Sequence, residues 1–162
     1  MIHDGGVASK CVEAAEPGDP AAISGPGRGY AIDRDALAFL LAGDESAIPA
    51  ISQLLEALPA ETPVQMHIEV AQPDARLTLP DHPRATVEWC DLAHGAPSGY
   101  ALVAAVRGTD LVPGTEVWVA GEVSAVQRIR RHLFEDRGLP RAQASVRGYW
   151  KHGRSGDTDD DA

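Results

Sequence analysis

Short apolar runs alternate with amphipathic stretches along most of this chain, and this alternation limits the fold more than any other feature. The first run, residues 36–42, is continuous and stops at Gly43. Such a run is typical of a strand that is buried on both faces of a sheet. A set of apolar residues at helical spacing comes next: Ile48, Ile51, Leu55 and Leu58. Strands that alternate with helices predict βαβ units and a parallel sheet.

The same criteria predict four more strands and two more helices. The strands are residues 64–70, 85–90, 115–120 and 144–150. The helices are residues 100–106, for which a strand is the alternative, and residues 123–137, which end before a glycine at position 138. Because crossovers between parallel strands are right-handed, we expect an α/β fold, a doubly wound and mostly parallel five-stranded sheet in the order 3-2-1-4-5.

Composition and charge exclude several classes of protein. A length of 162 residues favours one domain, and a hydrophobic content of 44% is ordinary for a globular protein. The net charge of −10 disfavours nucleic acid as a partner. No apolar run approaches the roughly 20 residues that span a bilayer, and the first residues do not resemble a signal peptide. We therefore expect a cytoplasmic protein without membrane insertion.

The cysteines and histidines show no motif for a metal or a disulfide framework. The two cysteines, Cys11 and Cys90, are far apart in the sequence. The six histidines are scattered, and no two of them have the spacing of a zinc-binding pair. We expect these histidines to be structural or solvent-facing, and we predict no metal ligand.

The turns after the first and fourth strands are the best candidate ligand site, because ligands of doubly wound sheets bind beyond the carboxyl ends of the strands. The first turn contains Gly43, Asp44, Glu45 and Ser46. A glycine there allows close backbone approach to a pyrophosphate, and the following helix offers free N–H groups. Two acidic side chains oppose an anion, however. The structural alternative is an acidic helix start that Ser46 caps, with Pro49 in the first turn.

Two further segments could contact a ligand. Gly121 and Glu122 follow the fourth strand, where a carboxylate could accept hydrogen bonds from an amide or a ribose. A second acidic helix start is the alternative. Residues 147–154 combine two aromatic side chains with four potentially cationic ones, which suits a flat ring and an anionic substrate. An edge strand with a solvated basic end would have the same composition.

Three segments resemble the signature motifs of siderophore-interacting proteins, in the same order: residues 40–51, 117–131 and 148–153. The resemblance implies that residues 36–153 form a ferredoxin-reductase-like NAD(P)H-binding domain. In this family a flavin-binding barrel precedes that domain, and electrons pass from NAD(P)H through FAD to ferric siderophores, which releases iron as Fe(II).

The resemblance also implies roles for individual residues, none of them catalytic. The pyrophosphate and ribose would lie against Gly43, Asp44, Glu45 and Ser46, and the nicotinamide would lie near Gly121 and Glu122. Trp150 would face the flavin. An anionic ferric chelate could reach Lys151 and Arg154.

Residues 1–35 resemble the closing part of the flavin-binding barrel. The arginine-tyrosine-threonine motif by which that barrel binds flavin is absent from this sequence. We therefore expect FAD only with a barrel domain that a partner contributes, and we expect residues 154–162 to be a disordered acidic tail. Three interpretations stay open: the NAD(P)H-binding half of a reductase, a non-catalytic binding module, and a fragment without independent function.

Overall fold

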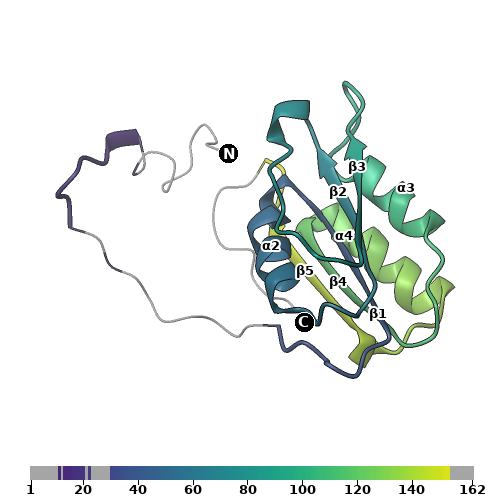
Figure 1. The fold of residues 1–162 in the computed structure, drawn as a ribbon. Coiled ribbons are helices and arrows are strands. Elements are labelled where there is room, and N and C mark those ends of the chain that lie inside the picture. Colours follow the sequence, from purple (N-terminus) through teal and green to yellow (C-terminus); the bar gives the residue numbers. More distant parts are fainter. Residues whose placement is uncertain (1–10, 12, 21, 23–29, 154–162) are drawn as a thin grey trace.

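The computed structural model describes residues 11, 13–20, 22 and 30–153. Its described residues contain one parallel sheet with the strand order β3-β2-β1-β4-β5. The strands are Ala38–Asp44 (β1), Val64–Val70 (β2), Ala85–Asp91 (β3), Thr115–Glu122 (β4) and Ala144–Trp150 (β5). The predicted fold class and strand order are confirmed, and Figure 1 shows the strands side by side.

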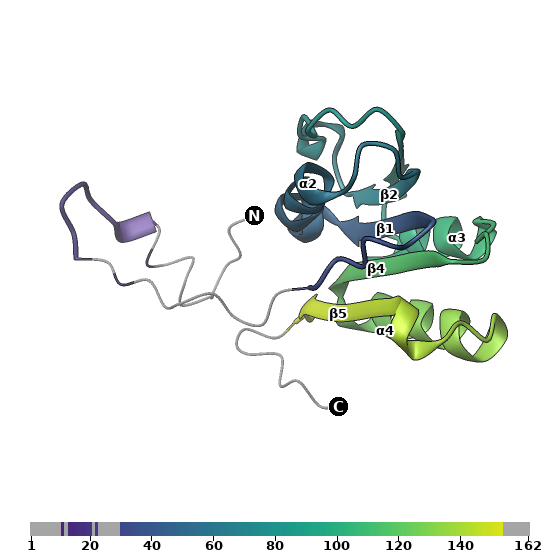
Figure 2. The same cartoon turned by 60° about the horizontal axis from the view of Figure 1, so that its bottom comes forward.

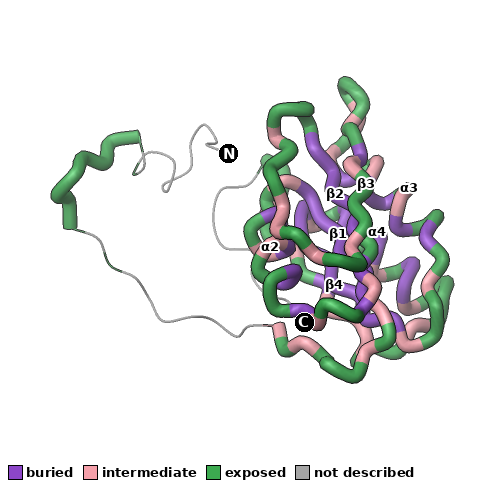
Figure 3. The backbone as a smooth tube through the Cα atoms, in the orientation of Figure 1, coloured by how far each residue is buried: buried purple, intermediate pink, exposed green. Residues whose placement is uncertain are grey.

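Helices cover both faces of this sheet (Figure 2). The helix Ile48–Ala57 (α2) packs on one face, and Tyr100–Gly108 (α3) and Val123–Arg131 (α4) pack on the other. Because each strand alternates its side chains between the faces, two apolar clusters form. Leu41 belongs to the cluster under α2, and Ala42 belongs to the cluster under α3 and α4. Figure 3 shows the central strands as buried.

Helix boundaries differ from the predictions at two places. Ser46 does not cap the first helix; instead, Asp44 accepts a hydrogen bond from the Ser46 N–H and caps a 3-10 turn over Glu45–Ala47. The predicted helix 123–137 ends as an α-helix at Arg131 and continues as a π-helical turn over His132–Asp136. The stretch for which helix and strand were alternatives is the helix α3.

Glycine ends the last helix as predicted. Gly138 has a φ of 66°, the left-handed conformation that favours glycine. The Leu139 N–H then donates to the carbonyl of Leu133 at 2.9 Å, which satisfies an otherwise unpaired carbonyl in the last turn.

The segment before β1 is described only in part. Tyr30 and Ile32 pack against the cluster under α2, and none of the described residues before Ala38 lies in a strand. The assignment of residues 1–35 to a barrel stays a prediction, and residues 154–162 lie outside the described residues. Within the described part of the chain, no helix has the length and apolar character needed to cross a bilayer.

Candidate functional site

The carboxylate of Asp44 connects the ends of three parallel strands. Its Oδ1 accepts hydrogen bonds from the N–H of Ser46 at 3.0 Å and from the Ser46 hydroxyl at 2.5 Å. Its Oδ2 accepts from the N–H of Glu122 and from Nε1 of Trp150, both at 2.8 Å. Asp44 is 7% exposed. The three sequence motifs thus meet at one buried carboxylate, at the edge where β1, β4 and β5 end.

Two glycines allow this close approach. A Cβ on Gly43 would lie 2.4 Å from the Cβ of Ala47 and 2.8 Å from the carbonyl oxygen of Ala120. A Cβ on Gly121, whose φ is +150°, would lie 2.6 Å from Oδ2 of Asp44. All three distances are shorter than packed protein atoms tolerate. The packing of the turn against β4 therefore already requires both glycines, before any ligand is considered.

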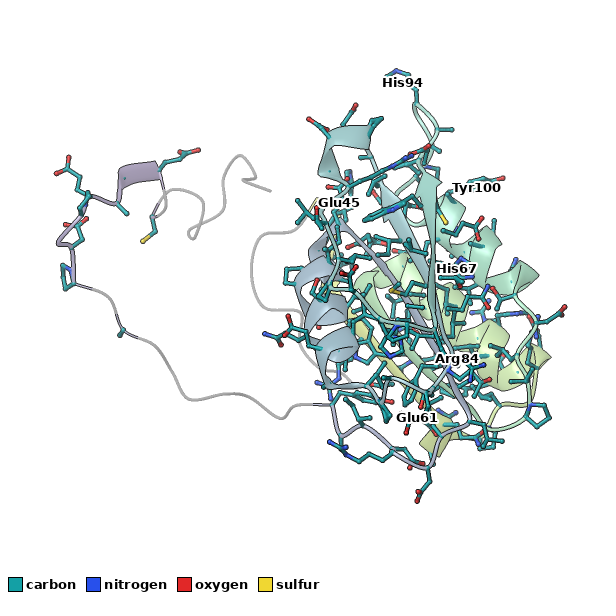
Figure 4. All side chains as sticks on the ribbon, in the orientation of Figure 1. Glu45, Glu61, His67, Arg84, His94 and Tyr100 are labelled. Atoms are coloured by element: carbon teal, nitrogen blue, oxygen red, sulfur yellow. The ribbon has the colours of Figure 1, made fainter. Side chains whose placement is uncertain are left out.

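The other acidic side chains of this edge accept hydrogen bonds from backbone N–H groups. Glu122 caps α4 through the N–H of Ala125 at 3.0 Å, and Glu69 accepts from Gly99 and Leu102 at the start of α3 at 2.5 and 3.0 Å. Glu45, labelled in Figure 4, accepts from the N–H of residue 71 at 2.6 Å. Because helix starts carry partial positive charge, this edge accommodates several carboxylates together.

A cavity of about 570 Å³ opens beside this network. Its volume lies in the range of small-molecule sites, roughly 300–1,000 Å³. It is lined by Asp44, Glu45, Ser46, Glu69, Ala71, Leu92, Ser98, Tyr149 and Trp150. The Tyr149 ring is also in edge-to-face contact with Trp118, with 6.3 Å between ring centroids, and its burial raises its pKa. The cavity lining thus combines aromatic side chains with hydrogen-bonding groups.

A second cavity, of about 470 Å³, contributes positive charge next to the first. Ser98 lines both cavities. The second is also lined by Ala96, Pro97, Glu122, Ser124, Arg128 and His152. The guanidinium of Arg128 is held over the first turn of α4 by a 3.4 Å hydrogen bond to the carbonyl of Ser124. This cavity has the donors that an anionic group would need.

The structure places the predicted site residues in different positions. One cavity brings together Asp44, Glu45, Ser46 and Trp150, and Glu122 lines the other. Gly43 and Gly121 lie beneath them in the packing of the turn. Lys151 is exposed and lines neither cavity, and Arg154 lies outside the described residues.

Sequence reasoning missed several cavity residues: Glu69, Ala71, Leu92, Ser98 and Arg128. Tyr149 was predicted only as one of the two aromatic side chains of residues 147–154. Glu69 carries a signal that could have found it, because it lies at the carboxyl end of a predicted strand beside the strand-order reversal. Leu92 and Ser98 lie in the connection between β3 and α3, and no motif marks them.

Comparison with known proteins finds relatives over most of the chain. A family model described as siderophore-interacting protein matches residues 36–153. An uncharacterized protein of Mycobacterium tuberculosis is 39% identical over 167 residues, covering 96% of this chain and 59% of its own length. The NADPH-dependent ferric-chelate reductase of Escherichia coli is 29% identical over 155 residues, covering 93% and 58%.

Solved structures extend the likeness to three dimensions. A siderophore utilization protein from T. fusca matches with a TM-score of 0.81 and 34% identity, over 96% of this chain and 60% of its own. The ferredoxin reductase of carbazole 1,9a-dioxygenase, with a TM-score of 0.53 and 20% identity, shares the fold. The chain thus spans about three-fifths of the length of the siderophore-related proteins it matches. The match over residues 36–153 shows that the chain belongs to the siderophore-interacting protein family.

Proposed function

We propose that residues 36–153 are the NAD(P)H-binding domain of a flavin-dependent ferric-siderophore reductase that releases iron as Fe(II). One observation carries the proposal: the cavity of about 570 Å³ at the carboxyl edge brings together Asp44, Glu45, Ser46 and Trp150. Ligands of doubly wound sheets bind at this edge, beside the strand-order reversal. Family membership and the likeness to a ferric-chelate reductase of Escherichia coli support it.

The two cavities suit the two kinds of group in a dinucleotide. Leu92, Tyr149 and Trp150 give the first cavity an apolar and aromatic wall, which favours a flat ring. Ser98 and Arg128 in the second cavity favour a phosphate. The carboxylates at this edge accept N–H hydrogen bonds, which offset part of the repulsion toward an anion.

We assign the remaining roles by position in the family. Glu45 and Ser46 would contact the ribose and pyrophosphate, and Gly121 and Glu122 would lie near the nicotinamide, which supplies the hydride when it is bound. Asp44 would act by positioning, because its bond to Nε1 fixes the edge of the Trp150 indole.

The flavin and the iron chelate require parts beyond this domain. We propose that residues 1–35 belong to the closing part of a flavin-binding barrel, and that residues 154–162 form an acidic tail. Lys151 and Arg154 would then contact the anionic ferric siderophore through their positive charge. The expected location is the cytoplasm.

The experiment is a titration of the whole chain with NADPH and NADH, followed by calorimetry. We expect weak binding, because no flavin is present for the nicotinamide to stack on. Arg128→Gln should weaken NADPH binding by roughly 10-fold, the effect of about one charge-assisted hydrogen bond. The matched control is Arg84→Gln, since Arg84 also donates to a backbone carbonyl, that of Glu61, at 2.8 Å. It lies by the opposite edge of the sheet (Figure 4).

A non-catalytic binding module is the second candidate, and the same chain can test it. Addition of FAD and a relative's flavin-binding barrel should give NADPH-dependent reduction of a ferric siderophore, followed with a chelator that absorbs on binding Fe(II). If the chain binds neither nucleotide at millimolar concentration, the reductase proposal fails. If it binds NADPH but never supports reduction, the binding module takes its place.

A further inference from the structure

Two neighbouring strands bring a histidine, a glutamate and a cysteine together outside both cavities. His67 lies on β2, and Glu88 and Cys90 lie on β3; in the parallel register His67 pairs with Glu88. All three side chains leave the sheet on the face that α3 covers, because side chains two residues apart share a face. One ligand atom of each residue lies within 4.8 Å of the other two. Figure 4 labels His67 in this part of the sheet.

The His67 ring is oriented by the residue that ends α3. The hydroxyl of Thr109 donates its only proton to the carbonyl of Ala105 at 3.0 Å. Its oxygen lies 2.7 Å from Nε2 of His67 and can accept from it, whereas the Gln65 amide nitrogen, 3.4 Å from Nε2, suits the opposite tautomer. With the proton on Nε2, Nδ1 has a lone pair; with the proton on Nδ1, that N–H faces Glu88 and a bound metal ion would displace the proton. Metal-binding histidines are commonly oriented in this way, by a hydrogen bond from the other ring nitrogen.

Nδ1 of His67 is buried beside a carboxylate. His67 is 2% exposed, and Nδ1 is a buried atom without a hydrogen bond. Oε2 of Glu88 lies 2.9 Å from it. In the tautomer with the proton on Nε2, the lone pair of Nδ1 faces a carboxylate oxygen, an arrangement that a cation between the two acceptors would satisfy.

We propose that Nδ1 of His67, the Cys90 thiolate and the Glu88 carboxylate bind one Zn²⁺ ion. Imidazole, thiolate and carboxylate are the ligands that zinc takes in proteins, and three of them leave a fourth position for water. With zinc–ligand bonds of about 2.0–2.3 Å, ligand atoms lie about 3.3–3.8 Å apart in a tetrahedral site. Nδ1 and Oε2, now 2.9 Å apart, would have to separate, and atoms as far apart as 4.8 Å would have to approach one another. Glu88, whose side chain is 65% exposed, has room to move.

The charges around Cys90 favour a cation. Burial, together with the nearby carboxylates of Glu88, Glu69 and Asp91, raises the pKa of the Cys90 thiol to about 11. Of these groups, the Glu88 carboxylate is the one that would attract a divalent ion directly, because Glu69 accepts from Gly99 and Leu102 and Asp91 pairs with Arg76. On binding, the thiol would release its proton, and the two negative ligands would balance the two positive charges of zinc.

The zinc ion would fasten the edge strand β3 to β2. Both strands supply ligands, and none of the three residues lines either cavity of the proposed nucleotide site. The proposal therefore does not rest on the proposed function. Zinc binding should raise the thermal stability of the chain, because a ligand that binds only the folded state stabilises it.

The test is titration of the metal-free whole chain with Zn²⁺ by calorimetry and with Co²⁺ by absorption spectroscopy. We expect one ion per chain, a cobalt spectrum of a tetrahedral site with a thiolate-to-metal charge-transfer band, and a higher melting temperature with Zn²⁺. Cys90→Ser should abolish the charge-transfer band, and His67→Gln should weaken binding by at least about 100-fold, more than the loss of an outer-shell partner costs. Cys11→Ser and His94→Gln are the matched controls and should bind as the wild type does.

The cobalt spectrum of the wild-type chain keeps the proposal testable even if a variant fails to fold. A charge-transfer band that persists in Cys11→Ser assigns the thiolate to Cys90 and supports the site. Three results would overturn it: no binding at about 100 μM metal, a cobalt spectrum without thiolate absorption, or unchanged affinity in a folded Cys90→Ser variant. The last result would mean that the ion binds elsewhere, for example at the acidic C-terminal residues.

Discussion

The cluster around Asp44 and the cluster around His67 both bury polar side chains in the sheet, and they differ in how those side chains are satisfied. The two oxygens of Asp44 accept four hydrogen bonds from three other parts of the chain. Nδ1 of His67 accepts none and faces a carboxylate oxygen. Unpaired buried polar atoms are rare in folded proteins. In the Asp44 cluster the carboxylate is satisfied by hydrogen bonds within the chain, whereas the His67 cluster has a buried nitrogen for which we infer a further binding partner.

The comparison also shows that charge alone is a poor guide to a ligand site. Several carboxylates gather at the carboxyl edge, which would repel a phosphate if they were free. Asp44, Glu69 and Glu122 all accept N–H groups at the starts of helices or turns. These three carboxylates therefore stabilise the fold through their hydrogen bonds, and the cavity lies beside them. At the His67 cluster, Glu69 accepts from the N–H groups of Gly99 and Leu102 and Asp91 pairs with Arg76, so only the Glu88 carboxylate, which faces His67, favours a cation there.

The largest expected effect is on the Asp44 cluster. Asp44→Asn would place an amide NH₂ where an oxygen now accepts from Glu122 and Trp150. The N–H of Glu122 and Nε1–H of Trp150 would then point at another hydrogen-bond donor instead of an acceptor. We expect a loss of about 3–5 kcal/mol in the free energy of unfolding, since buried donors are left unsatisfied. Chemical denaturation measures it.

The matched control for this change is Asp81→Asn, at an exposed position. It should stay within about 0.5 kcal/mol of the wild type, as surface substitutions usually do. If the two variants lost equal stability, Asp44 would not be the connecting residue that its hydrogen bonds indicate.

The fold could be predicted because its evidence is local. A continuous apolar run such as residues 36–42, followed by helical spacing, identifies a buried strand and a crossover helix without any tertiary information. The carboxyl-edge rule then placed Asp44 and Glu122 at the same end of the sheet, whereas Trp150 was found from the composition of residues 147–154 and from the family resemblance. The cap formed by Asp44 was not predicted, because a 3-10 turn precedes α2 and a turn of three residues is too short to show helical periodicity. The π-helical turn after Arg131 was not predicted either, because apolar spacing does not distinguish it from an α-helix.

The His67 cluster could not be predicted from spacing along the chain. Its ligands come from two strands, and zinc motifs are recognised when ligands lie a few residues apart. The predicted order made β2 and β3 neighbours, but the register decides which side chains meet. Only the pairing of His67 with Glu88 brings Cys90 close enough to share a ligand, and the residue that contacts Nε2 of His67, Thr109, comes from a third element.

The two cysteines provide the next test, in a chain freed of metal. Cys90 is buried and its thiol has a pKa of about 11, whereas Cys11 is exposed. The thiolate is the reactive form, so iodoacetamide at about pH 8 should modify Cys11 at least ~100-fold faster than Cys90. Mass spectrometry of a time course measures both rates. Equal rates in the folded chain would contradict the burial of Cys90, and denaturant should make the rates converge.

The smallest expected effect is the pH dependence that His67 contributes to stability. Its pKa is lowered in the folded chain, chiefly by burial, so the unfolded chain binds a proton there at a higher pH than the folded chain does. The stability that the neutral ring contributes is therefore fully present above the unfolded value of about 6.5 and is lost as pH falls through the lower folded value. The slope cannot exceed about 1.4 kcal/mol per pH unit for one proton. Denaturation curves from about pH 8 to about pH 5, with a chelator present, should fall more steeply for the wild type than for His67→Gln. Identical slopes would show that the ring titrates as an ordinary exposed histidine, and the contrast with the Asp44 cluster would then disappear.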